Sequence, residues 1–120
     1  MRSVTKLVEC SFLIPLRRDK SLSDGKPHRR TAWKWLDNQL MRFEGATRAL
    51  QLYEGWYPDP DTGKRVTDRS RKFWVALPAE TIRQLRVLLQ EACRVFCQRC
   101  IYLSIAGHVE LVKGRGDENS

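Results

Sequence analysis

The sequence predicts an α+β fold, a ferredoxin-like βαββαβ two-layer sandwich with a four-stranded antiparallel sheet and two helices on one face. Residues 6–16 alternate between apolar and other side chains, which is the period of a strand with one buried face. Segments 31–44 and 78–99 repeat apolar residues every three or four positions, as amphipathic helices do. Strand-like segments at 47–57 and 73–77 separate these helices, and a last strand is expected within 101–112.

The first half of the chain supplies one strand and one helix. The strand carries its buried side chains at alternate positions, namely Val8, Cys10, Phe12, Ile14 and Leu16. Residues 17–30 follow as a polar loop with glycine, proline and serine, which favour turns. The helix is expected to be capped by Thr31 and to end near Gly45. Its buried stripe consists of Trp33, Leu36, Leu40 and Phe43.

The second half supplies a hairpin, a helix and a final strand. A turn at residues 58–63 joins the second strand to a basic arm, which leads into the third strand. In that third strand Phe73, Val75 and Leu77 are expected to face the helices. The last strand is expected to bend or bulge at Gly107. The second helix buries Ile82, Leu85, Leu89, Ala92 and Phe96.

Length and composition predict one domain. The chain has 120 residues, so we expect a single ferredoxin-like domain over residues 1–112 and a flexible polar tail over 113–120. The longest apolar run, residues 12–16, is far shorter than the ~20 residues of a membrane helix, and the N-terminus lacks the pattern of a secretory signal. We therefore expect a cytoplasmic protein.

The net charge of +8 indicates an acidic partner, either a protein or a nucleic acid. In the expected topology the loop after the first strand and the hairpin before the third lie at the same end of the sheet. Together they carry half of the 22 basic residues, which predicts an anion-binding or nucleic-acid-binding edge. The residues assigned to this edge are Arg17, Arg18, Arg29, Arg30, Lys64, Arg65, Arg69, Arg71 and Lys72, with Lys20 and Lys26 beside them.

The cysteines are expected to be free thiols in the core. Cys93, Cys97 and Cys100 have the spacing of an iron–sulfur motif, but on an amphipathic helix this spacing also places them on one face beside apolar residues. Neither His28 nor His108 completes a standard zinc pattern with them. We therefore expect no metal and no cofactor.

The face of the sheet away from the helices is expected to carry Trp74, which alternates with the core residues of its strand. Such a tryptophan could stack on a nucleic-acid base. It could equally close a homodimer or line a ligand cavity, because an open apolar sheet face is normally covered. The second pair of alternatives is favoured.

Two resemblances follow from particular segments. Phe12, Leu13 and residues 71–75 faintly resemble the central strands of RNA-recognition-motif domains. Gly55-Trp56, Ser70-Arg71 and residues 96–103 resemble small uncharacterised bacterial ferredoxin-like proteins, as do Gly107 and Val109-Glu110. That resemblance implies a fold without an established activity, and by analogy it implies that Gln98 and Tyr102 line a pocket.

These observations lead to a main functional hypothesis and an alternative. The main hypothesis is a non-catalytic binding or assembly module whose basic edge docks an acidic partner. The alternative is a homodimeric α+β enzyme or ligand carrier with a cavity on the open sheet face, involving Trp56, Trp74, Gln98 and Tyr102. The sequence contains no glycine-rich phosphate loop, no nucleophile elbow and no evident carboxylate pair, so no catalytic residue is predicted.

Overall fold

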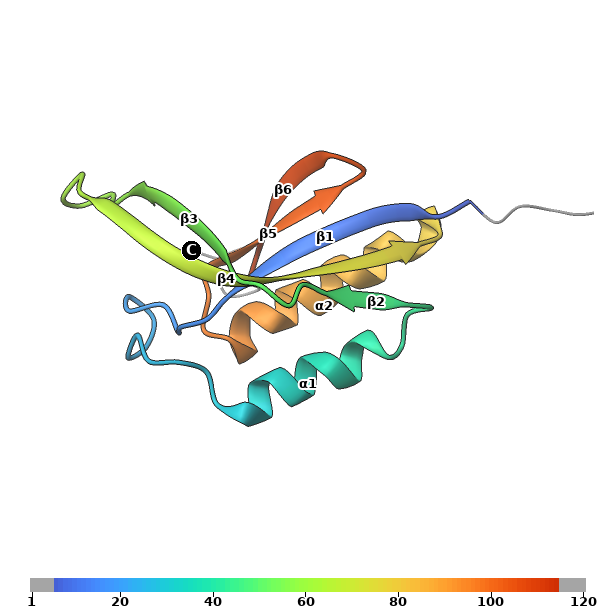
Figure 1. The fold of residues 1–120 in the computed structure, drawn as a ribbon, viewed down its shortest axis with the longest axis horizontal. Helices are drawn as coiled ribbons and strands as arrows, with labels where there is room; N and C mark the ends of the chain where they lie inside the picture. Colours follow the sequence, from blue (N-terminus) through green and yellow to red (C-terminus); the bar gives the residue numbers. More distant parts are fainter. Residues whose placement is uncertain (1–5, 115–120) are drawn as a thin grey trace, which may run out of the picture.

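The computed structural model describes residues 6–114, which form one sheet and two α-helices (Figure 1). The elements in chain order are β1 (Val8–Pro15), α1 (Arg30–Leu40), β2 (Ala46–Arg48), β3 (Tyr53–Pro58), β4 (Arg65–Leu77), a short 3-10 helix η1 (Ala79–Thr81), α2 (Ile82–Val95), β5 (Cys100–Ile105) and β6 (His108–Lys113).

All strand pairs in the sheet are antiparallel, and β1 and β4 form its centre. The strand order is β2-β4-β1-β5-β6, and β3 pairs with the outer half of β4. Phe12 lies opposite Phe73 on β4 and opposite Leu103 on β5, so its side chain is at the middle of the core. The segment around Phe73 is therefore a central strand, as expected.

The expected four-stranded ferredoxin-like sheet is wrong, because the sheet has six strands. The strand expected at 47–57 is two strands, since residues 49–52 stand opposite only Arg71 and Lys72 and loop out of the ladder. Leu50 at this loop is 96% exposed. The segment 47–57, which the sequence predicts as one strand, is therefore interrupted by an exposed loop.

The segment expected as one last strand is also two strands, β5 and β6, joined by a two-residue turn. Ala106 and Gly107 both have positive φ, 50° and 87°, as the tight turns of β-hairpins require. Gly107 is therefore the second residue of a chain reversal and not a bulge within a strand.

Both helices cover one face of the sheet (Figure 1). The helix stripes and the inward side chains of β1, β4 and β5 form one core, whose largest fully buried members include Phe12, Phe73, Phe96, Ile14, Leu36, Leu77, Leu85, Leu89, Ile101 and Leu103. An aromatic cluster closes this core at one end, where the ring of Phe96 lies 4.8 Å from His28 and 5.0 Å from Trp33. Arg86 on α2 and Glu110 on β6 form an ion pair at 2.7 Å.

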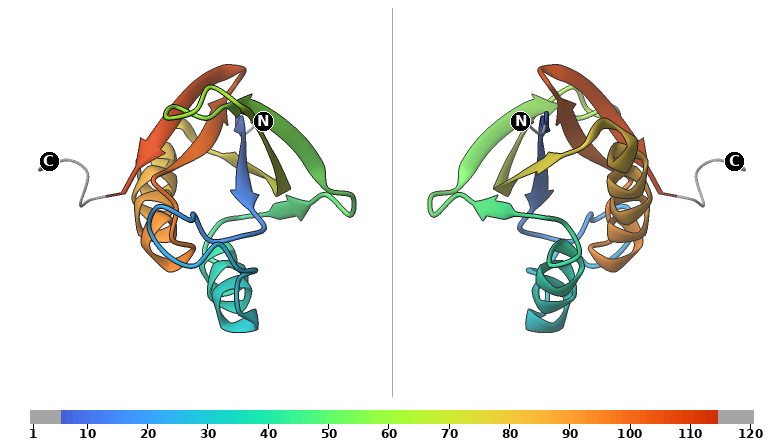
Figure 2. Two further views of the ribbon diagram at one scale, coloured as in Figure 1. Left: turned by 90° about the vertical axis from the view of Figure 1, so that its left-hand side faces the viewer. Right: turned by 90° about the vertical axis from the view of Figure 1, so that its right-hand side faces the viewer.

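Two hairpins extend from the other side of the sheet. The outer β3–β4 arm and the β5–β6 hairpin both lie away from α1 and α2 (Figures 1 and 2). They flank the uncovered face of β1 and β4, so this face is bordered on two sides. Within residues 6–114 no helix is long and apolar enough to cross a membrane. Most of the polar tail expected from residue 113, namely 115–120, lies outside the described residues.

Candidate ligand-binding site

The candidate site is the sheet face opposite the helices, which we call the open face. Residues directly opposite in a ladder point to the same side of a sheet, so the register assigns its members. Ser11 lies opposite both Trp74 and Ser104, which puts β1, β4 and β5 side chains on one surface. By the same alternation the open face includes Leu13, Tyr53, Tyr57, Asp68, Ser70, Lys72, Tyr102, Val109 and Leu111.

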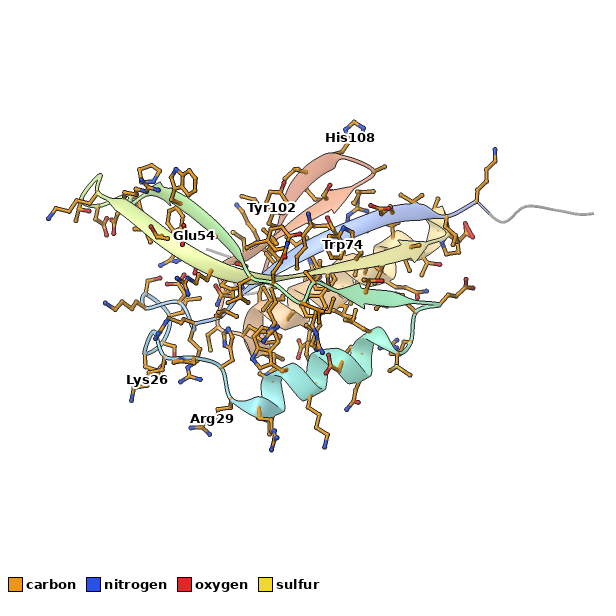
Figure 3. The ribbon with its side chains drawn as sticks, in the orientation of Figure 1. Lys26, Arg29, Glu54, Trp74, Tyr102 and His108 are labelled. Carbon is orange, nitrogen blue, oxygen red and sulfur yellow. The ribbon has the colours of Figure 1, made fainter. Side chains whose placement is uncertain are left out.

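A cation between two aromatic rings marks the middle of the open face. The Lys72 ammonium lies 5.1 Å from the centroid of Trp74 and 5.2 Å from that of Tyr53. Small side chains surround this group, because Ser11 and Ser70 occupy neighbouring positions and are almost fully buried. Flat rings beside small residues provide a surface on which a planar heterocycle can stack. Figure 3 labels Trp74 and Tyr102 on this side of the sheet.

An acidic group lies near the β3–β4 arm on the same face. Burial raises the pKa of Asp68, and the nearby negative charge of Asp19 raises it further. A hydrogen bond from the backbone N–H of Arg69 lowers the same pKa. The pKa of Tyr57 is also raised, first by burial and then by several acids, of which Asp68 is the strongest. A half-buried carboxylate beside a phenol is thus available on a surface of a protein with net charge +8.

Tyr53, Tyr57 and Asp68 were not identified as site residues from the sequence. Tyr53 and Tyr57 follow a period of two, as do Asp68, Lys72 and Trp74, and this was the available signal. The signal does not tell which strands are neighbours or which residues stand opposite one another. The face could therefore be assigned only once the β3–β4 register was known.

The first loop lies at the same end of the molecule as the tip of the β3–β4 hairpin (Figure 1), and one of its predicted basic residues, Arg18, is paired with an acid. Arg18 makes a bidentate pair with Asp24 at 2.7 and 2.9 Å, and this pair holds the pKa of Asp24 well below its ordinary range. Arg17 donates weakly to the carbonyl of Gly25, 3.5 Å away. Arg29 and Arg30 lie at the start of α1, where Arg29 is the residue before the first helical turn.

The basic residues of the β3–β4 arm are spread over both faces. The guanidinium carbon of Arg65, which follows Lys64 at the hairpin turn, lies 4.6 Å from the ring centroid of Trp56. The guanidinium of Arg69 is 3.9 Å from the carboxylate of Glu54. Arg71 points to the helix side, over Trp33 at 5.7 Å, whereas its neighbour Lys72 is on the open face. The expected single basic edge is therefore divided between two surfaces.

The other predicted pocket residues also separate. Tyr102 and Trp74 share the open face, as the register shows. Trp56 lies opposite Thr67 and so points to the other side of the arm. Gln98 is buried, and its amide donates to the carbonyls of Arg17 and Phe96 at 2.7 and 2.9 Å. Gln98 therefore joins the end of α2 to the first loop and does not line the open face.

Two cavities lie on the helix side. One, of about 600 Å³, is a groove between α1 and α2 that includes Trp35, Phe43 and Leu88. The other, of about 310 Å³, lies where the first loop meets the start of α1 and the end of α2. No group of three metal-ligating side chains is found within residues 6–114.

His28 gives this end of the protein a pH dependence. Its Nε2–H donates to the carbonyl of Pro15 at 2.7 Å, while burial, and then the charge of Arg18, lower its pKa. The unfolded chain then binds a proton more readily, so stability should be complete above about pH 6.5 and be lost as the pH falls below it. Urea unfolding at pH 7.5, 6.5 and 5.5 should show this slope, and His28→Gln should reduce it. An equal reduction by His108→Gln would contradict the assignment.

Comparison with known proteins gives two similar solved structures. A phage SAM lyase in complex with S-methyl-5′-thioadenosine aligns over 95% of both chains, with a TM-score of 0.66 and 13% sequence identity. A phage SAM lyase in the apo state aligns over 96% of this chain and 95% of the other, with a TM-score of 0.64 and 16% identity. No protein-family model and no curated protein sequence matches the chain. At these identities the likeness establishes a shared fold, the fold of the phage SAM lyases.

Proposed function

We propose that this protein is a small-molecule enzyme of the SAM lyase type, which binds S-adenosylmethionine on the open face and releases S-methyl-5′-thioadenosine. The observation that carries the proposal is the fold likeness to a SAM lyase, because it extends over 95% of both chains and leaves no unmatched domain. It supports an enzyme or ligand carrier, the alternative hypothesis, better than a non-catalytic module. Fold alone does not fix function, and the chemistry of the open face provides further support.

The aromatic part of the open face suits the adenine ring. Trp74 and Tyr53 present flat surfaces beside Lys72, and Tyr102 stands on β5, which is separated from β4 by β1. Base–aromatic stacking contributes about 1–3 kcal/mol per base. An adenosyl group placed here would bury its ring against β4 and leave its ribose and sulfur free to reach the β3–β4 arm.

The acidic part of the face suits the sulfonium. S-adenosylmethionine carries a positive charge on sulfur, and a protein of net charge +8 needs local negative charge to bind it. Asp68 and, at longer range, Asp19 supply that charge. When the bond from sulfur to the amino-acid chain breaks, the electron pair remains on sulfur, and neutral S-methyl-5′-thioadenosine departs. The chain carbon that loses this pair forms its new bond to the carboxylate oxygen of the same substrate, which closes a lactone ring and uses no second reactant. A carboxylate of the protein therefore distinguishes the substrate from the neutral thioether product.

The test is direct. The full-length protein is incubated with S-adenosylmethionine, and release of S-methyl-5′-thioadenosine is followed by chromatography, with calorimetry for binding of each compound. We expect turnover of S-adenosylmethionine and binding of both compounds. A protein that binds neither compound would refute the proposal, whereas binding without turnover would support a ligand carrier over an enzyme.

The Trp74→Ala variant should weaken binding of S-methyl-5′-thioadenosine by about tenfold or more, because the stacking surface is removed. Calorimetry measures this change. Trp56→Ala is the matched control, since Trp56 is an exposed tryptophan on the opposite side of the β3–β4 arm and should leave affinity unchanged. Equal losses in the two variants would place the ligand elsewhere.

Docking of an acidic protein or a nucleic acid, and a homodimer through the open face, stay predictions. The net charge supports an acidic partner. The pairing of Arg18 and Arg69 with acids, however, weakens the case for one continuous basic surface that contacts it. Nucleic-acid binding would fall steeply with salt. The dimer would bury the same aromatic face that the proposed ligand uses.

A further inference from the structure

The smaller helix-side cavity is lined by three arginines and no acid. It has a volume of about 310 Å³ and lies on the opposite side of the sheet from the open face. Its lining consists of Arg18, His28, Arg29, Thr31, Ala32, Trp35, Arg94 and Val95. Clustered guanidinium groups repel one another, so such a lining favours an anion inside it.

Two of the arginines are held in place by acids that do not line the cavity. Arg18 uses Nε and Nη2 for Asp24, and Arg94 uses Nε and Nη2 for Glu91. In each case no hydrogen bond is found from Nη1 to a residue within 6–114. The side chain of Arg18 is only 16% exposed, so its remaining N–H groups are fixed in position. Each ion pair thus orients a guanidinium group and leaves its Nη1 group able to donate to another acceptor.

The start of α1 adds further donors to the same cavity. Arg29 precedes the helix, has no ion pair among the described residues, and provides no side-chain cap. The first turn contains no acidic residue, so the backbone N–H groups of Arg30 and Thr31 lack an anionic partner there. Figure 3 shows Arg29 at the end of the molecule where α1 begins. Guanidinium and helix N–H donors together match a tetrahedral oxyanion.

We propose that this cavity binds a phosphate group. The guanidinium of Arg29 and the Nη1 groups of Arg18 and Arg94 contact the phosphate oxygens, and the first turn of α1 faces the same group. The phosphate is either free in solution or part of a small nucleotide, whose base would lie against Trp35. The site is independent of the proposed lyase activity because it lies across the sheet from the open face.

His28 reports on the occupancy of this cavity. The positive charge of Arg18 contributes to the lowered pKa of His28, so a bound dianion should raise that pKa. The chain contains only two histidines, and His108 lies on the distant β5–β6 hairpin. An NMR pH titration of the full chain with and without inorganic phosphate, at constant ionic strength, therefore has its own internal reference. We expect the pKa of His28 to rise when phosphate is added, with the His108 resonances as the reference.

Substitutions and a second ligand complete the test. Arg29→Ala and Arg94→Ala should each weaken phosphate binding about tenfold, whereas Arg83→Ala, in the other helix-side cavity, should not. Tighter binding of 5′-AMP than of phosphate would identify a nucleotide as the source, and equal or weaker binding would identify free phosphate. The proposal would be overturned if neither phosphate nor AMP changed the pKa of His28, or if all three variants lost the same affinity for phosphate. Binding of a single-stranded oligonucleotide without binding of phosphate or AMP would also overturn it.

Discussion

The Phe12→Ala variant should lose about 3–5 kcal/mol of unfolding free energy, the range for truncation of a buried aromatic side chain. Phe12 is fully buried, and its ring stacks on Phe73 with centroids 5.2 Å apart and planes 13° apart. The loss combines the transfer of the ring to water with the cavity that it leaves between β1, β4 and β5. Since domains of this size are stable by ~5–15 kcal/mol, much of the stability would be gone.

Urea unfolding followed by tryptophan fluorescence measures this change. Leu50→Ala is the control, because Leu50 is an apolar side chain on the exposed loop between β2 and β3 and should change stability by less than about 0.5 kcal/mol. Phe12→Leu keeps most of the buried volume and should be intermediate. A loss below about 1 kcal/mol in Phe12→Ala would contradict the central position of this side chain.

The position of Phe12 was predictable because local patterns determine it. The alternation of Cys10, Phe12 and Ile14 requires only that one face of a strand be buried, and all three side chains are fully buried. The stripe on α2 is equally local, and it ends where Phe96 meets His28 and Trp33. Such patterns depend on burial alone and do not depend on which strand is the neighbour.

The number of strands was not predictable because it depends on where the ladder is interrupted. The loop at 49–52 forms because β2 and β3 both pair with β4 while their linker is two residues longer than the β4 segment opposite. The reversal at Ala106 has a positive φ at a residue type that rarely adopts it, so the usual asparagine or aspartate signal is missing. The loop thus depends on how two strands pair with a third, and the reversal lacks a local turn signal.

The open face was predicted in part for the same reason. Trp74 could be assigned to it from alternation within its own strand, and the register places Tyr102 on the same face. Asp68 could not be assigned, because its environment comes from Tyr57 on another strand and from Asp19 in the first loop. The net charge points to the basic residues, whereas the proposed substrate, which is a cation at sulfur, calls for the acid on the open face.

The Asp68→Asn variant should lower turnover of S-adenosylmethionine by about 100-fold at substrate concentrations below saturation. Burial raises the pKa of Asp68, and the positive sulfonium of a bound substrate favours the ionised carboxylate. Asparagine has the same shape without the charge. A charge-assisted contact contributes about 1.5–3 kcal/mol, which corresponds to roughly one to two powers of ten in binding.

Loss of a charge contact and loss of local structure would affect the binding of the two compounds differently. S-methyl-5′-thioadenosine is neutral at sulfur, so Asp68→Asn should leave its affinity nearly unchanged while that of S-adenosylmethionine falls. Asp61→Asn, in the turn between β3 and β4, is the matched control and should affect neither compound. If Asp68→Asn weakened the binding of both compounds equally, Asp68 would support the shape of the β3–β4 arm and would not recognise the sulfonium. Only a direct charge contact distinguishes the cationic substrate from its neutral thioether product.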